Sequence, residues 1–239
     1  VRDYFGGDEV PDLDLGAAVL RGSVVERLAG PLAPGQVAQL GTSDASAIGT
    51  VQSVIGDAWL TRIDGSRVQI TQGSAIHQGD VVETGAGGGL AIAFVDGTSL
   101  SLSDSARMVI DELVYSASSS SNAASFSLVQ GLFVLVSGDI AKTGEMLVET
   151  PVSTIGIRGT SVAIQAATEG LRNIITLLQD PDGHVGVVEV ATAVASVILS
   201  AIGETTSVSS ANQAPTAIEV LTSADVESLY RAALSTMQT

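Results

Sequence analysis

The sequence predicts an all-β protein: stacked hairpins forming a sandwich-like or short solenoid body, with an extended N-terminal arm and a C-terminal amphipathic helix. Three observations predict it. Aliphatic residues alternate with small polar residues along many short runs. Asp-Gly pairs, which suit the positive φ angles of tight hairpin turns, separate several of these runs. The composition is 45% hydrophobic but only 3% aromatic and 15% charged, which favours thin, turn-rich β layers over a helical enzyme.

Changes in composition along the chain predict three regions. Residues 1–46 form an acidic arm punctuated by glycine and proline, with Asp8, Asp12 and Asp14 near its start. Residues 47–210 form the β domain, because the period-two alternation begins there and continues through the following runs. Residues 211–239 form a linker, marked by Ala214-Pro215, and a closing helix.

Two hairpins are the most clearly marked elements of the β domain. The first joins residues 59–63, where Trp59, Thr61 and Ile63 alternate, to residues 68–70 through Asp64-Gly65. The second joins residues 90–94 to residues 100–102 through Asp96-Gly97. In the second hairpin the serines at 99, 101 and 103 fall on the face opposite the leucines. We therefore expect strands with one buried face and one solvated face.

The remaining elements follow the same logic. Residues 115–125 predict a polar loop, and residues 126–135 a strand with a bulge at Gly131. Gly138-Asp139 predicts a turn, and further strands are expected at 162–164, 171–178, 184–190, 196–202 and 205–209. Thr222 and Asp225 form a capping box before the helix. Its apolar stripe consists of Val226, Leu229, Tyr230, Ala233, Leu234 and Met237.

Charge and composition exclude several functions. The net charge is −16, and Lys142 is the single lysine, so the chain has no basic surface for nucleic acid or for an anionic membrane. There is no cysteine to form a disulfide or a thiolate metal site. The longest apolar run, residues 191–202, is too short to span a bilayer, so we expect no membrane insertion.

Motifs for catalysis or cofactor binding are missing from the sequence, so we predict no enzyme, no cofactor and no catalytic residues. The glycines at 85–89 do not complete a dinucleotide fingerprint and indicate a loop lying close to another backbone. His77 and His184 are far apart in sequence, and a histidine–carboxylate pair stays an open alternative. Calcium is possible at Asp180 and Asp182 or at the acidic arm, although solvated acidic turns explain these residues more simply.

Arg158 is the strongest candidate for an interaction residue. Ile155 and Ile157 point to one face of their run, so Arg158 points to the other, between Gly156 and Gly159. One interpretation is that the guanidinium tethers an adjacent loop. The other is that it docks a partner strand or an acidic segment, such as Asp8, Asp12 and Asp14 of a neighbouring copy.

The ordered succession of motifs resembles the FecR-domain family over residues 48–165. It includes QGDVVETGAGG (residues 78–88), FVDGTSLSLS (residues 94–103) and TPVSTIGIRGT (residues 150–160). The sequence is similar in particular to FecR-like modules near the N-termini of large secreted surface proteins of alphaproteobacteria, which precede adhesin-like repeats. The resemblance identifies no catalytic residues.

The resemblance implies a non-enzymatic role, in one of two settings. The first is an extracellular or cell-surface structural module that anchors or assembles a larger surface protein, with self-assembly as an open alternative. The second is a periplasmic FecR-type signalling domain that binds a segment of an outer-membrane transporter. Both imply protein partners, with copies of the chain itself among the candidates.

Overall fold

The computed structural model describes residues 13–14, 19–20, 46–119 and 121–236. The chain divides into two compact units, Val1–Asp44 and Ala45–Thr239. In the first unit, β1 (Leu13–Asp14) pairs in antiparallel fashion with β2 (Val19–Leu20). Asp8 and Asp12 of the predicted arm lie outside the described residues.

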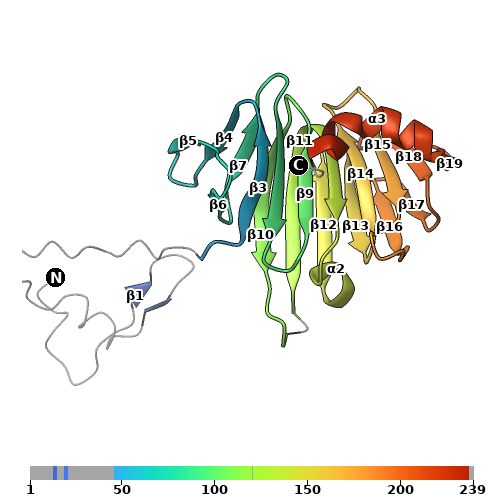
Figure 1. The fold of residues 1–239 in the computed structure, drawn as a ribbon. Coiled ribbons are helices and arrows are strands. Elements are labelled where there is room, and N and C mark those ends of the chain that lie inside the picture. The colour runs from blue at the N-terminus through green and yellow to red at the C-terminus, as the bar shows by residue number, and fades with distance from the viewer. Residues whose placement is uncertain (1–12, 15–18, 21–45, 120, 237–239) are drawn as a thin grey trace, which may run out of the picture. The chain divides into compact units, whose positions relative to one another are not determined.

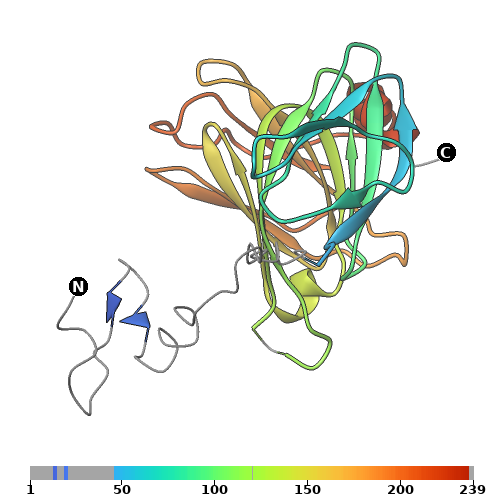
Figure 2. The same cartoon turned by 90° about the vertical axis from the view of Figure 1, so that its left-hand side faces the viewer.

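The second unit is a stack of β-strands in two layers (Figures 1 and 2). We call them the groove layer and the helix layer, after the features on their outer faces. The groove layer runs, in spatial order, β5 (Arg67–Gln69), β4 (Ala58–Thr61), β7 (Val81–Thr84), β10 (Arg107–Val114), the first part of β11 (Ala123–Val136), β12 (Glu145–Thr150), β13 (Ser153–Arg158), β16 (Val187–Ala191) and β17 (Ser196–Leu199).

The helix layer runs β6 (Ala75–Ile76), β3 (Gly49–Ile55), β8 (Gly89–Phe94), β9 (Ser99–Leu102), the second part of β11, β14 (Ser161–Ala166), β15 (Asn173–Leu178), β18 (Glu204–Val208) and β19 (Glu219–Val220). Neighbours pair in antiparallel fashion, except that β11 and β12 are parallel. From β12 onward, successive hairpins alternate between the layers. The predicted all-β class and stacked, sandwich-like hairpins are confirmed.

The core lies between the two layers and is almost entirely aliphatic. Side chains at alternate strand positions point inward, and Leu90, Ile92 and Ile110 are completely buried. Two aromatic rings bridge the layers: Phe94 on β8 packs against Phe126 on β11, with ring centroids 5.2 Å apart. The low aromatic content is thus sufficient, because hairpins stacked in two thin layers need few large side chains to fill the space between them.

Strand β11 joins the layers by bending at Gly131. Before the bend it pairs with β10 in the groove layer, up to Gln130. From Gly131 onward it pairs with β14 and β9 in the helix layer. A register shift immediately precedes Gly131, whose φ is +118°, a conformation that favours glycine. The bulge predicted at Gly131 is therefore part of a corner where one strand changes sheets.

Both Asp-Gly hairpins are present, and Gly65 and Gly97 have φ angles of +82° and +86°. In the first hairpin, however, the buried face is the opposite of the face suggested by the large side chains. Leu60 is buried, while Ile63 is 87% exposed. Trp59 lies on the outer face, where the Arg67 guanidinium stacks 4.9 Å from its ring centroid. That cation–π contact stabilises the large Trp59 ring outside the core.

Helix α3 (Ser223–Thr236) covers part of the outer face of the helix layer (Figure 1). The capping box is confirmed: the Thr222 amide donates to Asp225 Oδ2 at 3.1 Å, and the Asp225 amide donates to Thr222 Oγ1 at 3.3 Å. The apolar stripe packs on Val134 and Ala163. Ser101, expected on a solvated face, is buried on this side of the layer. Met237 lies outside the described residues.

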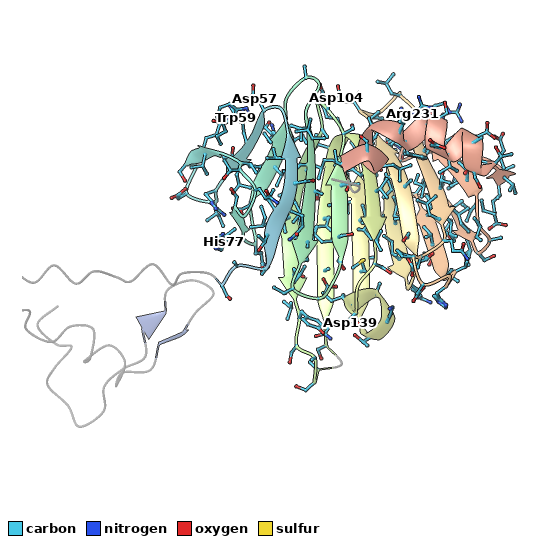
Figure 3. All side chains as sticks on the ribbon, viewed as in Figure 1. Asp57, Trp59, His77, Asp104, Asp139 and Arg231 are labelled. Carbon is cyan, nitrogen blue, oxygen red and sulfur yellow. The ribbon has the colours of Figure 1, made fainter. Side chains whose placement is uncertain are left out.

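Three smaller segments complete the body. The predicted turn at Gly138-Asp139 leads into a one-turn helix, α2 (Ile140–Thr143), whose preceding Asp139 is labelled in Figure 3. The polar loop after residue 115 ends earlier than predicted, because β11 begins at Ala123. The glycine-rich segment lies close to another backbone as expected, since the Gly85 amide donates to the Asp57 carbonyl at 2.7 Å.

Candidate functional site

A groove of about 410 Å³ crosses the outer face of the groove layer, over β12, β13, β16 and β17. Its floor is one row of registered positions: Leu147 lies opposite Gly156, Gly156 opposite Glu189, and Glu189 opposite Ile198. A β carbon added at Gly156 would have no atom within 4 Å. The groove is hollow there because glycine interrupts a row of larger side chains. Its full lining is Gly144, Glu145, Met146, Leu147, Gly156, Ile157, Arg158, Val187, Glu189 and Ile198.

Arg158 lines this groove, and its orientation agrees with the strand period. Ile155 and Ile157 are buried, and Arg158 is exposed on the outer face of β13. Its guanidinium forms no hydrogen bond or ion pair with any residue that the structure describes, so the proposed tether to an adjacent loop has no partner there. The groove therefore combines an exposed cation with a partly apolar floor and two carboxylates, Glu145 and Glu189.

The glycines that flank Arg158 have different roles. Gly156 opens the groove, whereas Gly159 has a φ of +59° and lies beside the side chains of His184 and Lys142. Another backbone does lie close to Arg158 and Gly159, and it is that of Gly186. A β carbon there would overlap the carbonyl oxygens of Arg158 and Gly159. Sequence reasoning missed Gly186 because the pairing of β13 with β16 is not visible in the chain order.

The structure does not test whether the aspartates of the acidic arm bind Arg158. Asp14 belongs to β1 in the first unit, and the placement of the two units relative to each other is not determined. Asp8 and Asp12 lie outside the described residues. Recognition of Arg158 by these aspartates stays a prediction.

A second polar cluster joins Arg62, His77 and Asp80 at the N-terminal end of the body. Asp80 is 1% exposed, and its Oδ2 accepts from Arg62 at 2.6 Å and from the His77 amide at 2.7 Å. Arg62 Nη1 also lies 2.6 Å from His77 Nδ1, which must accept this bond because a guanidinium has only donors. In Figure 3 His77 lies below Trp59, toward the lower end of the first strands of the body.

A histidine–carboxylate pair, an open alternative from the sequence, is present in this cluster as His77 and Asp80. His77 and Asp80 contact each other mainly through the His77 backbone, and the side-chain partner of both is Arg62. Asp80 was a usable signal, since aspartate side chains in turns commonly bond to nearby backbone groups. Its arginine partner could not be identified from spacing alone.

Replacing Asp80 by alanine is expected to lower the free energy of unfolding by about 3 kcal/mol. The change removes the carboxylate of a largely buried ion pair and leaves Arg62 and the His77 amide without their acceptor. Urea unfolding followed by circular dichroism measures the effect. Asp64→Ala is the control, because Asp64 is an exposed turn aspartate. Equal stabilities for the two variants would contradict a structural role for Asp80.

Two of the aspartates considered as calcium ligands, Asp180 and Asp182, accept hydrogen bonds from within the protein. Asp180 Oδ1 accepts from Ser161 Oγ at 2.6 Å, and Asp182 Oδ1 accepts from the His184 amide at 2.9 Å. In the described part of the chain, no group of three or more histidine or carboxylate side chains is placed to hold a metal ion. Asp182 is exposed and fits the interpretation as a solvated turn residue, whereas Asp180 is only 7% exposed, so solvation does not explain it. Calcium binding stays untested.

Residues 80–179 match the family described as FecR protein. The match begins at Asp80 and contains β12 and β13, including Gly156 and Arg158, but it ends before β16 and β17. It covers 100 of the 239 residues, counting from 80 to 179. The other half of the groove therefore lies outside the matched segment.

The matching solved structures include three that are either distant from this chain or similar over a short part of it. Two are structures of a candidate anti-sigma factor from Parabacteroides distasonis: one is 15% identical with a TM-score of 0.49, and the other 16% identical with a TM-score of 0.48. The chain spans 63% and 62% of their respective lengths, and 62% and 61% of this chain is covered. The third is a cell surface anchoring domain, 33% identical over 26% of this chain and 80% of that one, with a TM-score of 0.25.

No curated protein matches the sequence. Among the described residues, no helix has both the length and the apolar character that a membrane span requires.

Proposed function

We propose that this chain is a non-catalytic, protein-binding module of the bacterial cell envelope that acts as a periplasmic FecR-type signalling domain. In this proposal the groove around Arg158 receives a segment of an outer-membrane transporter. The FecR match over residues 80–179 supports the proposal, because it includes the strands that carry Gly156 and Arg158. The observation that carries it is the exposed Arg158 guanidinium beside a partly apolar groove.

The lining of the groove determines which segment fits. Leu147 lies beside the gap left by Gly156, and Ile198 lies one strand beyond Glu189 on its other side, so both offer apolar contact. Arg158 offers a planar pair of donors for a carboxylate. Glu145 and Glu189 lie nearby and would repel a segment with acidic residues throughout. The best occupant is therefore a short, extended segment with one carboxylate next to aliphatic residues.

Peptide binding tests this proposal. Labelled peptides covering the periplasm-facing segments of the source organism's outer-membrane transporters are titrated with the protein, and fluorescence anisotropy reports binding. We expect peptides of the described pattern to bind. Arg158→Glu should lower their affinity at least about tenfold, equivalent to about 1.4 kcal/mol. The loss is expected because the substitution replaces attraction by repulsion.

Arg231→Glu is the matched control, since it makes the same charge change on the exposed side of α3 (Figure 3). It should leave the affinity unchanged. If no transporter peptide binds, or if both arginine variants weaken binding equally, the groove is not the binding site.

A second function, a structural module of a larger surface protein, is favoured by one observation. Strand β17 forms an edge of the groove layer with Ile198 56% exposed, and such an edge can add a strand from another protein. An immunoblot of fractionated source cells separates the two functions. A band far above 24 kDa, outside the cell and lost on mild surface proteolysis, supports the surface module. A band protected in the periplasm supports the signalling domain.

A further inference from the structure

The edge strand β17 lacks the features that normally protect a sheet edge. Among the described residues, the strand registers pair it with β16 alone. The segment from Ala191 to Gly203 contains no charged residue and no proline, although the whole chain carries a net charge of −16. Val194, Ile198 and Ile202 are 59%, 56% and 50% exposed along it. Soluble proteins usually block such edges with charges, prolines or bulges.

The hydrogen-bonding pattern between β16 and β17 shows which backbone groups of β17 point out of the free edge. In the turn before β17 the Thr192 amide donates to the Ala195 carbonyl at 2.9 Å. In an antiparallel ladder, hydrogen-bonded and non-hydrogen-bonded pairs alternate along each strand. The register Val190↔Val197 and Glu189↔Ile198 then directs the amide and carbonyl of Val197 toward β16. Those of Ser196 and Ile198 point away from the sheet, toward the free edge.

We propose that β17 pairs with β17 of a second copy of this chain, in antiparallel fashion about a two-fold axis at Ile198. Residues 196–200 read Ser-Val-Ile-Leu-Ser, which is self-complementary in that arrangement. Ile198 meets Ile198 of the second copy on the outer face, and each Val197 meets a Leu199 on the core side. Each Ser196 meets a Ser200. The outward backbone groups of the two Ile198 residues form one hydrogen-bonded pair, as the two-fold axis requires.

The self-complementary sequence selects a second copy as the occupant, and the uncharged edge allows it to approach. Two copies of a chain with net charge −16 repel each other over most of their surfaces, and the uncharged edge segment is where they can approach. The nearby carboxylate of Glu204 is turned inward, because it accepts from the amides of Ser200 and Ala201 at 2.6 and 3.0 Å. That contact also uses the Ser200 amide, so the pairing is short and the dimer is weak, with a dissociation constant in the micromolar range or above.

The dimer has a consequence for the groove, although it does not depend on the proposed function. Ile198 both lines the groove and lies on the two-fold axis. Pairing would therefore join the grooves of the two copies end to end across the new strand pair. An extended segment could then contact both copies.

Solution mass tests the dimer directly. Sedimentation equilibrium on the whole 239-residue chain, up to about 1 mM, should show a shift from 24.1 kDa toward twice that mass. Ile198→Lys should stay monomeric, because it places two ammonium groups against each other at the axis. Val220→Lys, on the exposed edge strand β19 of the helix layer, should dimerise as the wild type does.

Disulfide trapping tests the register, and the lack of native cysteine makes it selective. Ile198→Cys should form a cross-linked dimer under mild oxidation, because residues in a hydrogen-bonded antiparallel pair have Cα atoms about 5.5 Å apart. Val95→Cys, similarly exposed at 55%, should not. A wild type that stays monomeric at the highest concentration, or an Ile198→Lys variant that dimerises normally, overturns the proposal. Species larger than a dimer would also overturn it, because a two-fold pair is closed.

Discussion

Replacing Gly131 by alanine is expected to lower the free energy of unfolding by about 2 to 5 kcal/mol. Two costs add at this corner. A φ of +118° strains any residue with a β carbon, by about 1 to 2 kcal/mol. The new β carbon would also overlap Ala106, which is buried, and displacing a packed neighbour costs about 1 to 3 kcal/mol. Urea unfolding followed by circular dichroism measures the sum.

Two other glycines separate these costs. Gly65 has a φ of +82° but no atom within 4 Å of an added β carbon, so Gly65→Ala should show the strain alone. Gly156 has neither a positive φ nor a close neighbour, so Gly156→Ala should leave stability nearly unchanged. We expect the order Gly156→Ala, Gly65→Ala, Gly131→Ala in increasing loss of stability. A Gly131→Ala protein as stable as Gly65→Ala would show that β11 does not need a close approach at its corner.

Replacing Tyr230 by alanine is expected to release α3 from the helix layer, at a cost of about 3 to 5 kcal/mol. Tyr230 is completely buried between the helix and the sheet, where it packs with Val134, Ala163 and Ala233. Its hydroxyl lies 3.1 Å from Thr176 Oγ1. The other members of the stripe are smaller or only partly buried, so they cannot replace this contact. Hydrogen exchange should show α3 amides losing protection in the variant.

Tyr230→Phe is the matched control, because it keeps the ring and removes the hydroxyl. It should cost only about 1 kcal/mol, since Thr176 still accepts from Thr205 at 3.0 Å. Burial raises the pKa of the Tyr230 phenol far above its usual range, although the hydrogen bond with Thr176 lowers it slightly. Because the pKa is higher in the folded state, the unfolded protein ionises first as the pH rises. The folded state therefore loses stability above the unfolded-state pKa. Wild-type stability should therefore fall above about pH 10, and Tyr230→Phe should remove this part of the fall.

The sequence predicted the local elements well, for reasons that act within a few residues. Asp64-Gly65 and Asp96-Gly97 determine their hairpins, because the positive φ at each glycine belongs to the turn itself. Thr222 and Asp225 determine where α3 begins through their own reciprocal hydrogen bonds. The helical stripe was also correct, since its period requires no knowledge of the partner surface. The orientation of Arg158 followed from strand alternation alone.

The buried faces of the strands and the partners of the polar residues could not be predicted from local sequence patterns. Alternation gave two faces for residues 59–63 but could not say that Leu60 is the buried one. Ser101 was expected to be solvated, and it is buried because the helix layer carries α3 on its outer side. The Arg62–Asp80 pair was missed because nothing in either residue's neighbourhood identifies its partner.

The sequence by itself determined the all-β class, the hairpin turns, the capped helix and the outward direction of Arg158, because each depends on residues next to one another. Tertiary structure decided that β11 bends from one layer into the other at Gly131, and that β12, β13, β16 and β17 lie side by side. The groove exists only through that pairing. Leu147 and Ile198 are 51 positions apart, counting from 147 to 198, and strand register alone places them in the same row.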